Sequence, residues 1–330
     1  MRREETVMLH RLIRAGLAAS ALVALVGTPL SQARAQDYPT RPITLIVPYP
    51  PGGGVDVIGR LVAQRLSAAL GQQVVVENRG GAGGMIGFRD LAKAVPDGYT
   101  LGVMTSGISL SPSAGYDVNK DFSPIGLIAS TPILIVANQS FPAQSLGDLI
   151  ALAKQQPGKL AAGTPPAPTI NYLAVWLFKM AAGVDVTVVT YKGTAQLTND
   201  VIGNHVPLGF DTIPAAVSNV RAGQLRAIAV TGPTRSAALP TVPTAAESGL
   251  PGFDAVLYYG LTAPAGVPRP IVDRLNKELR TMLAADDFKN RLISVGDDPA
   301  PSTPEQYAEN IKREEGKWAA LVTKHGLKIE

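Results

Sequence analysis

The chain has 330 residues, 46% of them hydrophobic and 17% charged, which is enough to build a sizeable core and is expected to divide into two units. It contains no cysteine, so disulfides, thiolate metal sites and cysteine nucleophiles are excluded. Its net charge of +4 comes largely from residues 1–35, which hold five basic and two acidic residues; the other residues carry 25 basic and 24 acidic ones, so no nucleic-acid partner is indicated.

The first segment is typical of a secretory signal peptide. Basic residues up to Arg14 precede an apolar run over 15–30, and a small-residue cleavage site ends at Ala35. We expect residues 1–35 to be removed and the mature protein to be soluble and periplasmic. Translation from either Met1 or Met8 would give a complete signal peptide. The alternative to a cleaved signal peptide is an N-terminal membrane anchor that is not cleaved.

The segment VPYPPGGGVD, residues 47–56, links an apolar strand pattern at 43–47 to a helical pattern at 57–70. Its glycines leave backbone N–H groups exposed, and a helix N-terminus adds the positive end of its dipole. This arrangement favours an anion. Asp56 is expected to cap the helix and to face away from such a ligand.

Short β-rich runs then alternate with amphipathic helical patterns, which predicts an α/β fold with largely parallel strands. Strands are expected at 43–47, 73–77, 99–104, 133–137, 160–163, 186–190, 206–210, 225–230 and 255–261. Helices are expected at 57–70, 145–156, 170–182, 196–203, 212–222, 270–284 and 304–324.

Two stretches, 137–142 and 251–254, are interpreted as crossings between lobes. One lobe would then hold 36–137 plus 259–330 and the other 138–258, with a site in the cleft at the carboxyl ends of strands.

The residues needed for catalysis are missing. Beyond the leader only His205 and His325 remain, too few for a His-rich metal site. Ser106 has no base nearby in sequence, and no G-x-S-x-G is present. The glycine-rich stretches lack the Gly-Lys-Ser/Thr of a P-loop and the spacing of a dinucleotide-binding turn. We therefore predict no enzyme activity, no metal and no cofactor.

What remains is a set of loops that offer backbone donors and hydroxyls at strand ends, each of which could also be an ordinary tight turn. These loops are 52–54, 105–107, 163–164, 193–194 and 211–212. Together they suit a small anion.

Longer stretches of the chain resemble a known family. The opening YPTRPITLIVPYPPGGGVDVIGRLVAQRLSAALGQQVVVENRGGAGGMIG, and later AVPDGYTL, DFSPIGLIASTPILIVAN, YKGTAQLTNDVIGNHVPLGFDT and YYGLTAPAGVPRP, resemble the solute receptors of tripartite tricarboxylate transporters, the Bug family. The resemblance covers essentially the whole chain after the leader. It implies a two-lobed, type II periplasmic binding protein of the Venus-flytrap kind, in which loops of both lobes hold one carboxylate group of the ligand.

Carried over by position, the resemblance implies a set of ligand-binding residues from both lobes, with Lys192 as a possible counter-charge. The set is Tyr49, Pro50, Gly52, Gly53, Gly54, Thr105, Ser106, Gly163, Thr164, Thr169, Tyr172, Tyr191, Lys192, Phe210, Asp211 and Thr212.

The chain departs from the family pattern after the loop at 163–165. Tyr172 stands where the family usually has His, Asn171 where Gly is usual, and Trp176 where an acidic residue is common; the loop 107–115 is also shorter than usual. Either Tyr172 stacks on a flat aromatic acid, or Tyr172 and Trp176 pack against the sheet.

The function expected is therefore capture of a small organic carboxylate, an aromatic one such as terephthalate or an aliphatic dicarboxylate. The protein would be a monomer that delivers its ligand to the membrane subunits of a secondary tripartite transporter. A ligand-sensing partner of a sensor kinase and a secreted hydrolase are the alternatives.

Overall fold

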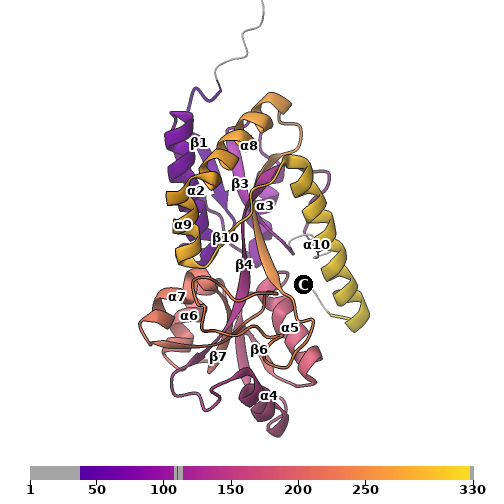
Figure 1. The fold of residues 1–330 in the computed structure, drawn as a ribbon. Helices are drawn as coiled ribbons and strands as arrows, with labels where there is room; N and C mark the ends of the chain where they lie inside the picture. The colour runs from indigo at the N-terminus through magenta and orange to yellow at the C-terminus, as the bar shows by residue number, and fades with distance from the viewer. Residues whose placement is uncertain (1–37, 108–109, 111–113, 328–330) are drawn as a thin grey trace, which may run out of the picture. The chain divides into compact units, whose positions relative to one another are not determined.

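A computed structural model of the chain describes residues 38–107, 110 and 114–327. The expected leader and most of the loop 107–115 lie outside the described residues. From Pro39 onward the chain forms one compact unit. Its strands follow the path β2-β1-β3-β9-β4-β7-β5-β6, with β8 and β10 paired to β4 (Figure 1).

One part of this sheet, called lobe 1 below, gathers the first and last strands of the chain. Helices α8 and α10 both pack on its strand β4, on opposite sides in Figure 1. Its other strands are β1 (Ile43–Val47), β2 (Val74–Asn78), β3 (Thr100–Thr105), β9 (Val256–Pro264) and β10 (Asp298–Pro299). Its helices are α2 (Gly54–Leu70), the short 3-10 turn η1 (Ala82–Gly84), α3 (Met85–Ala92), α8 (Arg269–Ala284), α9 (Asp286–Val295) and α10 (Pro304–His325).

The other part, lobe 2, is built from the middle of the chain. Its strands are β5 (Ala161–Thr164), β6 (Thr187–Thr190), β7 (Leu208–Thr212) and β8 (Leu225–Val230). Its helices are α4 (Leu146–Gln155), α5 (Ile170–Ala182), α6 (Thr194–Ile202) and α7 (Ile213–Arg221).

A single long strand, β4 (Phe122–Asn138), belongs to both lobes. Residues 122–132 pair with β9, and residues 133–138 pair with β7 and β8. Thr231, fully buried, holds the crossing: its hydroxyl accepts from the Ile133 N–H at 2.8 Å and lies 2.6 Å from the Ala255 carbonyl, to which it donates. The assignment of residues to lobes at 137 and 258 stays a prediction.

The α/β expectation is confirmed, but the expectation of a largely parallel sheet is wrong. β1, β2 and β3 are parallel, as are β5, β6 and β7, whereas every pair that involves β4 or β9 is antiparallel. The sequence patterns also missed α3, α9, β10 and the first part of β4.

The helices bury one face each, as their spacing predicts. In α2, Ile58, Val62 and Leu66 are fully buried at intervals of four residues, and Gly71 ends the helix in the left-handed conformation. Burying such a side chain contributes about 1.5–3 kcal/mol. The same packing fixes the N-terminus of α2 at the end of β1, where the functional site begins.

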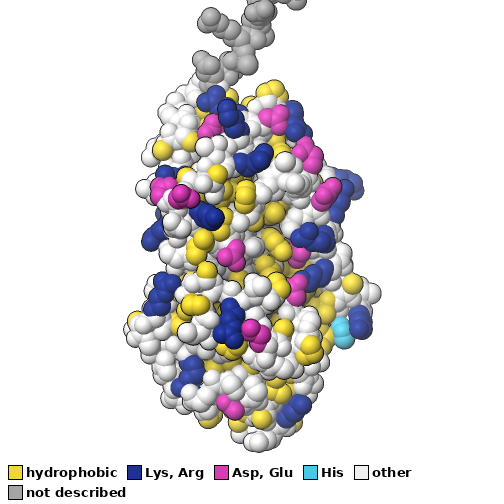
Figure 2. All heavy atoms as spheres, in the orientation of Figure 1, with side chains coloured by type: hydrophobic (Ala, Val, Ile, Leu, Met, Phe, Trp, Pro, Cys, Tyr) yellow, Lys and Arg dark blue, Asp and Glu magenta, His cyan; other side chains and the backbone are white. Residues whose placement is uncertain are grey.

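Charges of both signs are distributed over the surface. On the face drawn in Figure 2, Lys and Arg side chains are interspersed with Asp and Glu side chains over both lobes. Several charged side chains of the described residues form exposed ion pairs, such as Arg41–Asp97 at 2.8 Å. Pairs of this kind contribute little to stability.

Candidate functional site

A cavity of about 400 Å³ lies between the two lobes. Its lobe 1 wall comes from the loop after β1, the end of β3, and β9. Its lobe 2 wall comes from the starts of α5, α6 and α7. The lining residues are Tyr49, Pro50, Pro51, Gly53, Gly54, Val55, Thr105 and Leu257 on one side, and Pro165, Thr169, Ile170, Asn171, Lys192, Gly193, Thr194, Ala195, Gln196, Asn199 and Thr212 on the other. None of these is Asp or Glu, and Lys192 is the one charged residue among them.

Four helix N-termini border this cavity. The first residues or N-caps of α2, α5, α6 and α7 all belong to its wall. In α2, α6 and α7 the N-cap residue makes no side-chain capping bond. The first-turn N–H groups of a helix have no partner within the helix, and its dipole is positive at this end. These helix starts bring the positive ends of their dipoles to the wall of the cavity, which suits an anion.

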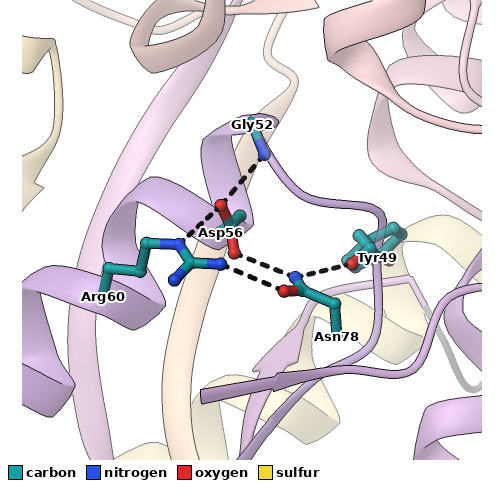
Figure 3. A network of polar contacts seen from close by, with 5 residues as sticks. All are labelled: Tyr49, Gly52, Asp56, Arg60 and Asn78. Carbon is teal, nitrogen blue, oxygen red and sulfur yellow. Dashed lines mark hydrogen bonds and ion pairs between the residues drawn. The ribbon is translucent and has the colours of Figure 1, made fainter.

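The loop between β1 and α2 is held by a buried carboxylate (Figure 3). Asp56 accepts hydrogen bonds from the Gly52 N–H and from Arg60 Nε, both at 2.9 Å, and from Asn78 Nδ2 at 2.9 Å. Asn78 Nδ2 also donates to the Tyr49 carbonyl at 3.0 Å. Burial raises the pKa of Asp56, but the bonds from Arg60, Gly52 and Asn78 outweigh it, so the pKa is lower than usual and the carboxylate stays ionised.

Asp56 therefore does not act as the expected cap, although it does face away from the cavity. The N-cap of α2 is Gly53, and Asp56 sits in the first turn, where it binds the N–H of the residue before the cap. The Gly52 N–H therefore donates to Asp56 and not to a ligand, and Gly52, one of the predicted ligand-binding residues, does not line the cavity. Gly52 serves the loop through its φ of +83°, a conformation that favours glycine.

Gly53 and Gly54 are required because lobe 2 comes very close to them. A Cβ on Gly53 would stand 2.7 Å from Thr194 Oγ1, and one on Gly54 would stand 2.5 Å from Thr212 Oγ1. The Gly54 N–H donates to Thr194 Oγ1 at 3.3 Å, so the N-termini of α2 and α6 meet across the cleft.

Two predicted hydroxyl residues, Thr105 and Thr212, line the cavity. Thr105 Oγ1 lies 2.9 Å from the hydroxyl of Tyr49, another lining residue. Burial raises the pKa of Tyr49 to about 12, and the bond to Thr105 offsets only part of this effect. Thr212 Oγ1 is buried and has no hydrogen-bond partner among the described residues. The Thr212 hydroxyl is thus unpaired but sealed from solvent, so it is not exposed to a ligand in the cavity.

Thr169 lines the cavity too, but its hydroxyl is occupied. It donates to the Pro166 carbonyl at 2.8 Å and accepts from the Tyr172 N–H at 3.3 Å, capping α5. Ser106 lies off the cavity, where its Oγ accepts from the Tyr258 N–H at 3.2 Å and ties β3 to β9.

The other predicted residues of lobe 2 lie behind the wall. Thr164 is fully buried, and a Cβ on Gly163 would meet Leu197 at 2.4 Å. Phe210 packs on Phe178 with ring centroids 5.8 Å apart. Tyr191 is buried in the lobe 2 core.

Asp211 is also fully buried behind the wall. It accepts from the Thr212 N–H at 2.7 Å and contacts the Thr198 hydroxyl. Burial raises its pKa to about 7, although both contacts lower it.

Tyr172 does not line the cavity. It lies half-buried beside Trp176, with ring centroids 6.2 Å apart, and Lys179 Nζ stands 4.6 Å from the centre of the Trp176 ring. The structure therefore gives no geometry for a ligand stacked on Tyr172.

The predicted residues missed the first half of α6, and they also missed Pro51, Val55, Pro165, Ile170, Asn171 and Leu257 among the lining residues. Gly193, Thr194, Ala195, Gln196 and Asn199 all line the cavity. The Gly-Thr pair after a strand had indicated a donor loop, and the spacing of 196 and 199 places both on one helix face.

No metal centre is found in the described part of the chain, where no three His, Cys, Asp or Glu side chains come together. Among the described helices none has the length and hydropathy needed to cross a membrane.

Comparison with known proteins gives matches over most of the chain. A family model, the tripartite tricarboxylate transporter family receptor, matches residues 58–327. BugT of Bordetella pertussis is 36% identical over 311 residues, 92% of this chain and 94% of BugT.

Solved structures match as well. The periplasmic binding protein BugD superposes with a TM-score of 0.84 at 35% identity, over 88% of this chain and 99% of BugD. Rpa4515 of R. palustris, solved with adipate, superposes with a TM-score of 0.85 at 35% identity, over 88% of this chain and 98% of its own. The two-lobed fold of periplasmic binding proteins, expected from the sequence, is confirmed.

Proposed function

Because the chain belongs to the tripartite tricarboxylate transporter receptor family, we propose that it captures a small aliphatic carboxylate in the cavity between its lobes. As a member of this family the chain is a solute-binding receptor of a transport system and not an enzyme.

The observation that carries this proposal is the wall of the cavity. Four helix N-termini border it, and no lining residue is acidic. A carboxylate accepts several hydrogen bonds from N–H and O–H donors. Bonds to a charged group in a site shielded from water are worth about 1.5–3 kcal/mol each, which is enough for capture without catalytic groups.

The proposed ligand is aliphatic because the one predicted stacking residue, Tyr172, lies off the cavity. The walls offer apolar contacts from Val55, Ile170 and Leu257 for a short carbon chain. Rpa4515, solved with adipate, provides a relative in which a ligand of this class is bound.

We further propose that the protein is exported by the segment 1–35, cleaved after Ala35, and acts in the periplasm as a monomer. The ligand would be passed to the membrane subunits of the transporter when the lobes open. Opening and closing of such lobes takes place on the microsecond to millisecond scale.

The test is a titration of the exported protein with aliphatic and aromatic mono- and dicarboxylates by calorimetry and thermal shift. A ligand at about 100 times its Kd adds about 2.7 kcal/mol of stability, a shift of several degrees in Tm. Gly53→Asp places a carboxylate at the N-terminus of α2 and is expected to abolish binding.

The matched control is Gly147→Asp in the first turn of α4, where a Cβ meets nothing nearer than 3.7 Å. Binding that survives in Gly53→Asp would contradict the proposal. Tight binding of aromatic acids only would contradict the ligand class.

A further inference from the structure

We propose that Asn171 selects ligands that carry a hydrogen-bond donor, a hydroxyl or an ammonium group, in addition to the carboxylate. This inference rests on the proposed function, because it concerns the same cavity. Asn171 is the second residue of α5; the residue is 4% exposed and lines the cavity.

The orientation of the Asn171 amide is fixed by the backbone of β7. Nδ2 donates to the Phe210 carbonyl at 3.0 Å in a buried position. A carbonyl oxygen can only accept, so the amide nitrogen must face Phe210 and the amide oxygen must lie on the other side.

We place this oxygen, Oδ1, at the cavity, because Asn171 lines it and Nδ2 is held on the other side by Phe210. It has no hydrogen-bond partner in the described part of the chain, and it is not one of the partnerless side-chain atoms sealed from solvent. Since Asn171 is otherwise buried and lines the cavity, the contact of Oδ1 with solvent is through the cavity.

Oδ1 is an acceptor only, which decides what can sit against it. A carboxylate oxygen would place lone pairs against lone pairs. A hydroxyl or an ammonium group would supply the missing proton. The helix N-termini offer donors to the carboxylate, and Asn171 offers an acceptor to a second group of the ligand.

A ligand without that second group leaves Oδ1 unpaired once the lobes exclude water. A site built to hydrogen-bond a polar group discriminates against analogues that lack it. An unpaired buried acceptor weakens binding by about ten- to a hundredfold.

The test uses pairs of acids with one carbon skeleton. Butyrate is compared with 2-hydroxy-, 3-hydroxy- and 3-aminobutyrate, and glutarate with 2-hydroxyglutarate and glutamate, by calorimetric titration. In at least one series a donor-bearing acid is expected to bind about ten- to a hundredfold more tightly than its parent. The hydroxyl and amino arms tell which donor is preferred.

Asn171→Leu keeps the size of the side chain and removes its oxygen, so the ratio of the two Kd values should fall to about one. Loss of the bond to Phe210 will also lower Tm, but a loss of stability alone does not change the ratio. Asn290→Leu is the matched control: this amide is exposed on α9 and does not line the cavity, so its removal should leave the ratio unchanged.

The outcomes separate the two proposals. If the acids bind but parents and donor-bearing acids bind equally, or if Asn171→Leu keeps the ratio, the role of Asn171 is refuted and carboxylate capture stands. If no acid of either series binds, both are refuted.

Discussion

Gly53→Ala is expected to weaken ligand binding while leaving each lobe folded. Gly53 has φ −82° and ψ 170°, which alanine adopts without strain. A Cβ there would stand 2.7 Å from Thr194 Oγ1, while the next atom, the Pro50 carbonyl oxygen, is 3.9 Å away. The added methyl group therefore meets one obstacle, and that obstacle belongs to the other lobe.

The size of the effect follows from this geometry. Ordinary contact begins at 3.4 Å, so the first turn of α6 must withdraw by about 0.7 Å or the cleft must stay open. Overpacking of this kind costs about 1–3 kcal/mol. Because the cost falls on the closed cleft, affinity should fall by about five- to 150-fold.

Calorimetric titration with the best-binding acid measures the loss, and a double-mutant cycle locates it. Thr194→Ala removes the oxygen, so Gly53→Ala should cost little in that background. Gly147→Ala, exposed in α4, is the control for a glycine-to-alanine change on a helix. Unchanged affinity in Gly53→Ala, or an equal loss in the Thr194→Ala background, would refute the reasoning.

Three further predictions concern residues at or behind the cavity wall. The pKa of Asp211 is raised to about 7 by burial, so the native state holds a proton that the unfolded state releases near pH 4. The contribution of Asp211 to the free energy of unfolding should therefore fall by up to about 4 kcal/mol as pH rises from 4 to 7. Urea unfolding across this range should find a smaller fall in Asp211→Asn than in the wild type, since Asp297 and Asp298 still contribute to the slope, and parallel profiles would contradict the assignment. Asp56→Ala leaves the Gly52 N–H without its acceptor, so it should lower the free energy of unfolding by about 1–3 kcal/mol in the same assay and weaken binding. An unchanged free energy of unfolding and an unchanged Kd would count against the role of this network. Ser106→Ala should lower the free energy of unfolding by about 1 kcal/mol and change Kd by less than twofold, because the Ser106 hydroxyl accepts from the Tyr258 N–H and does not line the cavity. A loss of binding in this variant would show that Ser106 contacts the ligand.

The elements that could be predicted are those whose ends carry local signals. Helix α5 was expected at 170–182 and is found there, because Thr169 caps its start and Gly183 adopts the left-handed conformation at its end. The first part of β4 was missed because Pro124 and Pro132 suggest a break. The strand tolerates Pro124 next to an irregularity in its pairing with β9.

The site shows the same limit at the level of single side chains. Sequence patterns located the loops at strand ends, but they could not tell which side chain of a loop points into the cleft. Thr105 and Ser106 are adjacent and opposite in direction: one contacts Tyr49 in the cavity and the other binds β9. The acceptor on Asn171 depends on a carbonyl 39 residues away in sequence, which no local pattern contains.

The meeting of α2 and α6 also bears on the energy of closing the empty cleft. Each helix begins there, with the positive end of its dipole, and the Gly54 N–H donates to Thr194 Oγ1 across the cleft. Two poles of the same sign repel, so the closed form without a ligand carries an electrostatic cost. An anion between the poles turns that repulsion into attraction. Closure is thereby linked to the charge of the ligand, and an uncharged amide of the same shape would enter the cleft without driving the lobes together.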